Sequence, residues 1–403
     1  MLVPKNGHDD LGQMAEANST FLRYRVDIAY RGSVKDGIRP RLEITHEELD
    51  YIRVGDAQDH LLFEPSKQWL KSVVQNKRTS KFISTELVGD EATVQLHQEG
   101  NQGRPRSFRA ATLPRTVLST VNAAESPTAL LARREMQSWR VLQLEPTSLR
   151  SPDLFTAPTM VDTDGSHLPA TLYHLNQTRG RDAHKDSVYA QIGNTLATLV
   201  DDVKSVYVER DEKQDLFTLH VVGMDGHPHP ARALSDGTLR FLALATIEAD
   251  ARAQGVICLE EPENGIHPER IDAMLSLLQD LAVDITEPIG DDNPLRQVII
   301  NTHSPTVVAL VPEDSVLFAD RLSYVHGGRH ASRVGFRFLA RTWRDRTRGS
   351  ASPVQKGAVL AFLNPVRTAA NNRRGEFHGD DRSRPVFRRD DIGQYALAFD
   401  ELR

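Results

Sequence analysis

The chain has 403 residues, of which 39% are hydrophobic and 26% charged, the proportions of a soluble globular protein with one or two domains. No run of about 18 apolar residues predicts a transmembrane helix, and the N-terminal residues lack the apolar stretch of a signal peptide. The single cysteine, Cys258, excludes an intramolecular disulfide. Together these features predict a cytoplasmic protein that makes no use of a membrane.

The net charge of −6 argues against a protein that binds nucleic acid over its whole surface, because such a protein would be basic throughout. The charge is uneven, however, because arginines outnumber carboxylates several-fold between about Arg329 and Arg389. Two interpretations of this stretch stay open. It is either a solvated, partly loose tail or a basic patch for DNA, RNA or an acidic partner.

The first half of the chain predicts a β-rich part, residues 1–110, followed by a helical insertion, residues 111–204. Alternating apolar and polar residues predict the strands, and Gly89-Asp90 predicts a hairpin turn. Apolar residues at helical spacing predict the helices. The expected strands are 21–30, 40–54, 81–88 and 91–98, and the expected helices are 115–141, 168–176 and 185–203.

The second half predicts a core, residues 205–322, and a basic C-terminal extension, residues 323–403. The core begins with a hairpin at 205–211 and 216–223 and continues as alternating helices and strands, which predicts a parallel α/β sheet. The extension predicts a hairpin around Gly327-Gly328 and a polar, arginine-rich segment, 366–391, that is expected to be disordered.

Two adjacent carboxylates follow an apolar strand in the core. Val256 to Leu259 form the run expected of a strand buried in a parallel sheet, and Glu260 and Glu261 come directly after it. Ligands of open α/β sheets lie at the carboxyl ends of the strands. There, one carboxylate can hold Mg²⁺ and the next can polarise the water that attacks a γ-phosphate. Two solvated glutamates at a strand end are the simpler alternative.

Two further segments point to the same chemistry. Ser235 is a favourable N-cap for a helix that extends to about residue 252, and Gly237 leaves backbone N–H groups open to an anion. His303 follows a second apolar strand, at 298–300, where its imidazole can donate a hydrogen bond to a γ-phosphate. Considered separately, each segment is also consistent with an ordinary capped helix.

Three segments, in this order and spacing, resemble parts of ABC-class ATPase heads of the RecF/SMC/OLD-like group. The signature is resembled by ALSDGT (233–238), the Walker B strand with D-loop by VICLEEPENGIHP (256–268), and the switch-histidine loop by IINTHSP (299–305). The resemblance implies a P-loop NTPase-like α/β head with a mainly parallel sheet. It also implies ATP and Mg²⁺ as ligands, and a homodimer that sandwiches ATP and acts on DNA or an effector protein.

Carried over residue by residue, the resemblance makes Glu260 the Mg²⁺-associated acid, Glu261 the catalytic glutamate and His303 the γ-phosphate sensor. The residues that would reach the ATP of the opposite head are Ser235, Gly237, Asn264 and His267. Asp236 departs from the pattern, because it stands where glycine is usual, and its carboxylate is expected to point away from phosphate.

The phosphate-binding loop G-x-x-x-x-G-K-[ST] occurs nowhere in the 403 residues. Gly7 and Gly12 have the right separation, but Gln13 and Met14 follow instead of Lys and Ser/Thr. One explanation is a chain that lacks its N-terminal part, in which case an ATPase of DNA repair, chromosome maintenance or phage defence is expected. The alternative is a degenerate ATPase that serves as a scaffold. No acidic cluster after residue 320 indicates an appended nuclease.

Overall fold

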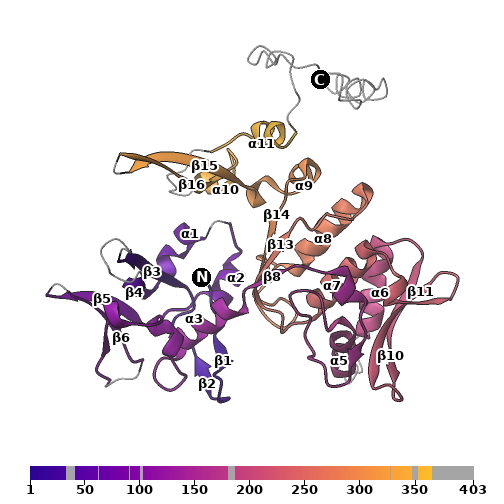
Figure 1. The fold of residues 1–403 in the computed structure, drawn as a ribbon, viewed down its shortest axis with the longest axis horizontal. Helices are drawn as coiled ribbons and strands as arrows, with labels where there is room; N and C mark the ends of the chain where they lie inside the picture. The colour runs from indigo at the N-terminus through magenta and orange to yellow at the C-terminus, as the bar shows by residue number, and fades with distance from the viewer. Residues whose placement is uncertain are drawn as a thin grey trace, which may run out of the picture. The chain divides into compact units, whose positions relative to one another are not determined.

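The computed structural model describes residues 1–32, 41–61, 63–89, 91–99, 103–179, 187–326, 328–346 and 353–364 (Figure 1). Chain contacts define one unit, Met1–Leu363, and a second, Asn364–Arg403. The segment 366–391, expected to be disordered, lies outside the described residues. Among the described helices, none is long and apolar enough to span a membrane.

The N-terminal lobe contains a five-stranded antiparallel sheet in the order β3-β4-β5-β6-β7. Its alternating strands bury one face around Leu22, Leu49 and Val94, which confirms the predicted strands and the Gly89 hairpin. The strands are β3 (Leu22–Arg31), β4 (Arg41–Tyr51), β5 (Ile83–Val88), β6 (Glu91–Leu96) and β7 (Arg106–Arg109), preceded by the hairpin β1 (Asn6–His8) and β2 (Met14–Glu16); helices α1 (Ala57–His60) and α2 (Lys67–Val73) lie between β4 and β5.

The helix predicted over 115–141 is wrong at both ends. The structure has a short 3-10 turn, Val117–Thr120, and then α3 (Pro127–Ser138), followed by a strand, β8 (Arg140–Leu142). Turn-forming residues fill the segment before Pro127, whose fixed φ suits the first helical turn. The Glu99 carboxylate, far away in sequence, accepts a hydrogen bond from the Thr128 amide (2.7 Å) and so caps the helix.

The later helices and the second hairpin agree with the predictions. Helix α4 (Pro146–Arg150) precedes β9 (Asp153–Leu154), and the predicted helices appear as α5 (Leu168–Arg179) and α6 (Val188–Leu199). The predicted hairpin is β10 (Val203–Asp211) with β11 (Leu216–Gly223), which also pairs with β9 and with β12 (Pro228–Pro230).

The core holds a parallel sheet in the order β14-β13-β8, in which β13 is Gly255–Glu260 and β14 is Arg296–Asn301. The helices α7 (Asp236–Ala249) and α8 (Ile271–Leu281) pack against one face (Figure 1). Ile257 and Leu259 point into that packing and are buried. The predicted parallel sheet, with the two candidate strands as neighbours, is confirmed.

The opposite face of this sheet is poorly covered. Cys258 pairs with Val141 on one side and Ile299 on the other, so the three side chains share a face. Val141 is 55% exposed and Ile299 48% exposed. Among the described residues, no strand pairs with the outer edge of β14. Because parallel sheets are normally covered on both faces, this face and edge are sites for further packing.

After β14, the chain forms α9 (Pro305–Leu310) and the antiparallel hairpin of β15 (Leu317–His326) and β16 (Arg329–Phe338), which confirms the predicted hairpin. The boundary expected between residues 322 and 323 falls inside β15. Helices α10 (Trp343–Arg346) and α11 (Lys356–Leu363) follow. A small core that includes Val308, Leu339 and Val359 joins α9, the segment after the hairpin and α11.

Candidate active site

The predicted site residues converge where the strands of the parallel sheet end. Glu260, the last residue of β13, is in register with Asn301, the last residue of β14. Gln143 follows β8 at the same edge. The parallel register brings the carboxyl ends of the three strands together, as expected for a ligand site of an α/β sheet.

Glu261 occupies a constrained position at this edge. Its φ is +44°, which is unusual for a residue with a side chain and costs on the order of 1–3 kcal/mol. Its amide donates to the carbonyl of Asn301 (2.7 Å), and its carboxylate accepts from Asn264 Nδ2 (2.5 Å). His303 Nε2 lies 3.8 Å from Glu261 Oε1. The turn therefore directs the second acid toward the loop that carries the histidine.

A cavity of about 380 Å³ opens between the two acids and the signature helix. Three polar residues that line it, Gln143, Glu145 and Arg240, were not recognised in the sequence. Arg240, on α7, donates a short hydrogen bond to the carbonyl of Asn264. The cavity is lined by Leu142, Gln143, Leu144, Glu145, Arg240, Leu244, Leu259, Glu260, Glu261, Pro262 and Asn264.

The signature segment lies beside this cavity without lining it. Ser235 caps α7, because its Oγ accepts from the Thr238 amide at 3.2 Å. Asp236, expected to point away from phosphate, is bound by Arg150 Nη2 at 2.5 Å, which neutralises its charge. A Cβ placed on Gly237 would lie 3.4 Å from the carbonyl of Gly265, so the start of α7 closely approaches the loop after β13.

His267 serves a local structural role in the described chain. Its Nδ1 accepts from the Glu269 amide at 3.4 Å and caps the 3-10 turn Pro268–Arg270. The side chain is 67% exposed, and it does not line the cavity. Glu260, Glu261 and Asn264 thus line the cavity, and His303, whose side chain is 77% exposed, lies next to Glu261 outside the lining. Ser235, Gly237 and His267 are also outside the lining.

The acids at the sheet edge fit a hard divalent cation, because Mg²⁺ prefers carboxylate oxygens and usually takes further oxygens from water and substrate phosphates. Within the described ranges, no group of three or more His, Cys, Asp or Glu side chains is placed to hold a metal. Glu260 is thus suited to be one protein ligand of Mg²⁺, with water and substrate phosphates supplying the other oxygens.

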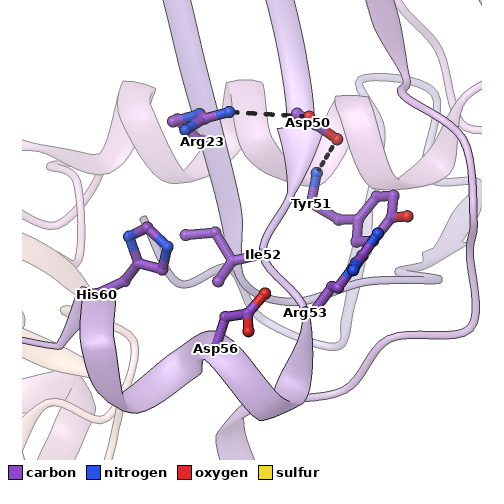
Figure 2. Close-up of a pocket in the computed structure, with 7 residues that line it drawn as sticks. All are labelled: Arg23, Asp50, Tyr51, Ile52, Arg53, Asp56 and His60. Carbon is purple, nitrogen blue, oxygen red and sulfur yellow. Dashed lines mark hydrogen bonds and ion pairs between the residues drawn. The ribbon is translucent and has the colours of Figure 1, made fainter.

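A second cavity, of about 260 Å³, lies in the N-terminal lobe (Figure 2). In it, Arg23 reaches toward Asp50 (3.9 Å), and the Tyr51 amide donates to the same carboxylate (2.8 Å). The other lining residues include Arg53, with Asp56 and His60 from α1 and the turn before it. Arginine and aspartate charges balance here, and the acid doublet is absent from its lining, so the sheet-edge cavity is the candidate site.

A parallel sheet with an acid doublet and a histidine at its carboxyl edge, together with an antiparallel lobe, defines the class of P-loop NTPase-like ATPase heads. The family model "AAA domain, putative AbiEii toxin, Type IV TA system" matches residues 39–309. The chain belongs to this AAA family. No curated protein matches the chain in sequence.

Solved structures of SMC ATPase heads are similar to parts of the chain. The Smc head domain with a coiled coil and joint from Pyrococcus yayanosii is 13% identical over 43% of this chain and 28% of that chain, with a TM-score of 0.26. The Smc head bound to the C-winged helix domain of ScpA is 12% identical over 71% and 86%, with a TM-score of 0.32. The chain thus spans less than a third of the first of these proteins.

Proposed function

We propose that the chain supplies the acid and histidine half of an ATP-hydrolysing site, and that a phosphate-binding loop completes this site. The observation that carries the proposal is the placement of His303 Nε2 3.8 Å from Glu261 Oε1, next to Glu260, at the carboxyl edge of a parallel sheet. The match to an AAA family over residues 39–309 supports ATP as the nucleotide.

Each side chain has a distinct role in this proposal. Glu261 accepts a hydrogen bond from the attacking water and orients it, and Asn264 holds the carboxylate in place. His303 donates a hydrogen bond to the terminal phosphate. Glu260 provides one oxygen for Mg²⁺, which neutralises charge on the phosphates when it is bound.

The poorly covered sheet face supports a phosphate loop that is supplied by an additional segment. A phosphate loop links a strand to a helix. A strand added to the free edge of β14 would end beside Asn301 and Glu260, and its helix would cover Val141, Cys258 and Ile299. The alternative function, a scaffold without turnover, is favoured only by the missing loop pattern.

A dimer that engages through ATP is part of the proposal. Ser235 and Gly237 lie at the start of α7, where the side chain of Ser235 is exposed. One of the similar structures is described with ATP-driven dimerization and DNA stimulated activation of SMC ATPases, at 11% identity and a TM-score of 0.24. The family description favours a role in toxin–antitoxin defence. DNA repair and chromosome maintenance are the other settings, with DNA or an effector protein as partner.

The first test is the coding sequence ahead of residue 1, where an in-frame G-x-x-x-x-G-K-[ST] segment supports the ATPase and its absence supports the scaffold. The chain extended by that segment is expected to hydrolyse ATP with Mg²⁺, with or without DNA. Glu261→Gln is expected to abolish turnover and to retain an ATP-bound dimer, because the amide cannot accept the proton of water.

The matched control is Glu269→Gln, which changes a carboxylate that is 87% exposed in the same loop and is expected to leave turnover unchanged. Unchanged turnover in Glu261→Gln would refute the assignment. The 403 residues alone are expected to turn over little ATP, and rapid turnover would mean that another residue replaces the lysine.

A further inference from the structure

Glu263, in the loop after β13, contacts the loop that follows β14 and carries His303, here called the histidine loop. Glu263 Oε1 accepts a short hydrogen bond from the Thr302 hydroxyl. Thr302 immediately precedes His303, and its Oγ1 in turn accepts from the Ser304 amide at 2.9 Å. The Glu263 carboxylate therefore holds the Thr302 side chain, which in turn binds the amide of Ser304, the residue after His303.

One backbone bond and one side-chain bond thus join the two loops, at the two residues that directly precede His303. The Glu261 amide donates to the Asn301 carbonyl, and the Thr302 hydroxyl donates to Glu263. His303 itself has a side chain that is 77% exposed, so packing contributes little to its position. Its placement near Glu261 depends on the neighbours that hold its backbone.

The burial of one carboxylate oxygen of Glu263 is unfavourable in the absence of such a role. Its Oε2 is buried and has no hydrogen-bond partner among the described residues. A buried carboxylate oxygen without a donor opposes folding. A neutral residue would avoid that cost, so the observed carboxylate is explained by the stronger, charge-assisted bond that it makes with Thr302.

From these contacts, we infer that Glu263 and Thr302 are positioning residues, which fix His303 against Glu261 through the bond between the two loops. The effect on hydrolysis rests on the proposed function, whereas the effect on the histidine loop does not. Neither residue contacts the reacting atoms in this scheme.

The test uses Thr302→Val, which removes the hydroxyl and keeps the shape, and Thr302→Ser, which keeps the hydroxyl. In the 403-residue protein, Thr302→Val is expected to raise hydrogen exchange of the Ser304 amide roughly tenfold, the value of about one hydrogen bond. Thr302→Ser and the control Glu269→Ala are expected to leave exchange unchanged. Because Thr302→Val also removes the acceptor of the Ser304 amide itself, Glu263→Ala is the variant that isolates the bond between the loops. Exchange of the Ser304 amide is expected to rise in Glu263→Ala, and exchange equal to that of wild type overturns the inference, whatever the chain does with ATP.

The second readout is ATP turnover in the chain that carries a phosphate loop. Thr302→Val and Glu263→Ala are expected to lower kcat between about 10- and 100-fold with little change in KM, because misplacement of a catalytic group acts on the reacting geometry. Thr302→Ser is expected to restore kcat. Raised exchange with unchanged kcat overturns the positioning role. If wild-type protein shows no turnover, the proposed function fails, and exchange alone decides the bond between the loops.

Discussion

Arg296 offers a quantitative test of how the sheet is attached to its helices. It is 2% exposed at the first position of β14, and burial lowers the pKa of its guanidinium to about 10. The group stays cationic at neutral pH and donates to backbone carbonyls at the ends of two helices. The acceptors are Ala253 (2.5 Å), Asp250 (2.9 Å), Leu281 (3.2 Å) and Glu248 (3.5 Å).

Arg296→Met keeps the length of the side chain and removes every donor. The three shorter bonds leave carbonyls unsatisfied, at about 1 kcal/mol each by the lower bound for buried polar groups. The free energy of unfolding is therefore expected to fall by about 3 kcal/mol, measured by urea denaturation followed by circular dichroism. The control Gln297→Met, exposed on the next residue, is expected to change it by less than about 0.5 kcal/mol. A loss below about 1 kcal/mol for Arg296→Met would refute the reasoning.

Two other changes test separate parts of the molecule. Arg150→Ala removes the ion pair of Asp236 at the start of α7. The free carboxylate is then expected to repel the phosphates and to raise the KM for ATP of the completed enzyme, and Asp236→Asn in the same background is expected to reverse the effect. A KM equal to that of wild type would contradict this. Burial, with a smaller effect of Arg78, lowers the pKa of His97 below its usual 6.5. As pH falls, His97 takes up a proton in the unfolded chain at a higher pH than in the folded protein, so the free energy of unfolding decreases as pH falls through 6.5. In His97→Gln, the free energy of unfolding is expected to depend less on pH between pH 7 and 5. An equally steep loss in that variant would assign the dependence to other groups.

Sequence patterns predicted the parts of the core whose signals are local. The strand that ends at Glu260 is an apolar run stopped by Pro262, and the strand before His303 is a similar run followed by Ser304-Pro305. Such runs and stops depend on burial and backbone geometry within a few residues. The acid doublet and the histidine could therefore be placed at strand ends, and the parallel order of the sheet made them neighbours.

The strand β8 and the residues around it could not be predicted in this way. Of its three residues, only Leu142 is buried, so neither a period of two nor an apolar run identifies it. It is a strand because it pairs with β13, far away in sequence. For the same reason, Gln143 was not recognised as a lining residue, and the ion pair between Asp236 and Arg150 joins positions that no local pattern connects.

The loop after β13 is held from two directions, and this arrangement determines what can move Glu261. From α7, Arg240 binds the carbonyl of Asn264, whose side chain binds Glu261. From β14, Thr302 binds Glu263. A shift of α7 therefore acts on the carboxylate through Asn264, while the bond from Thr302 to Glu263 ties the histidine loop to the loop after β13. Ser235 caps the same helix, so the surface proposed to meet a second head and Arg240 lie on one element, and two consecutive hydrogen bonds, from Arg240 to the Asn264 carbonyl and from Asn264 Nδ2 to Glu261, link that helix to the acid proposed to orient water.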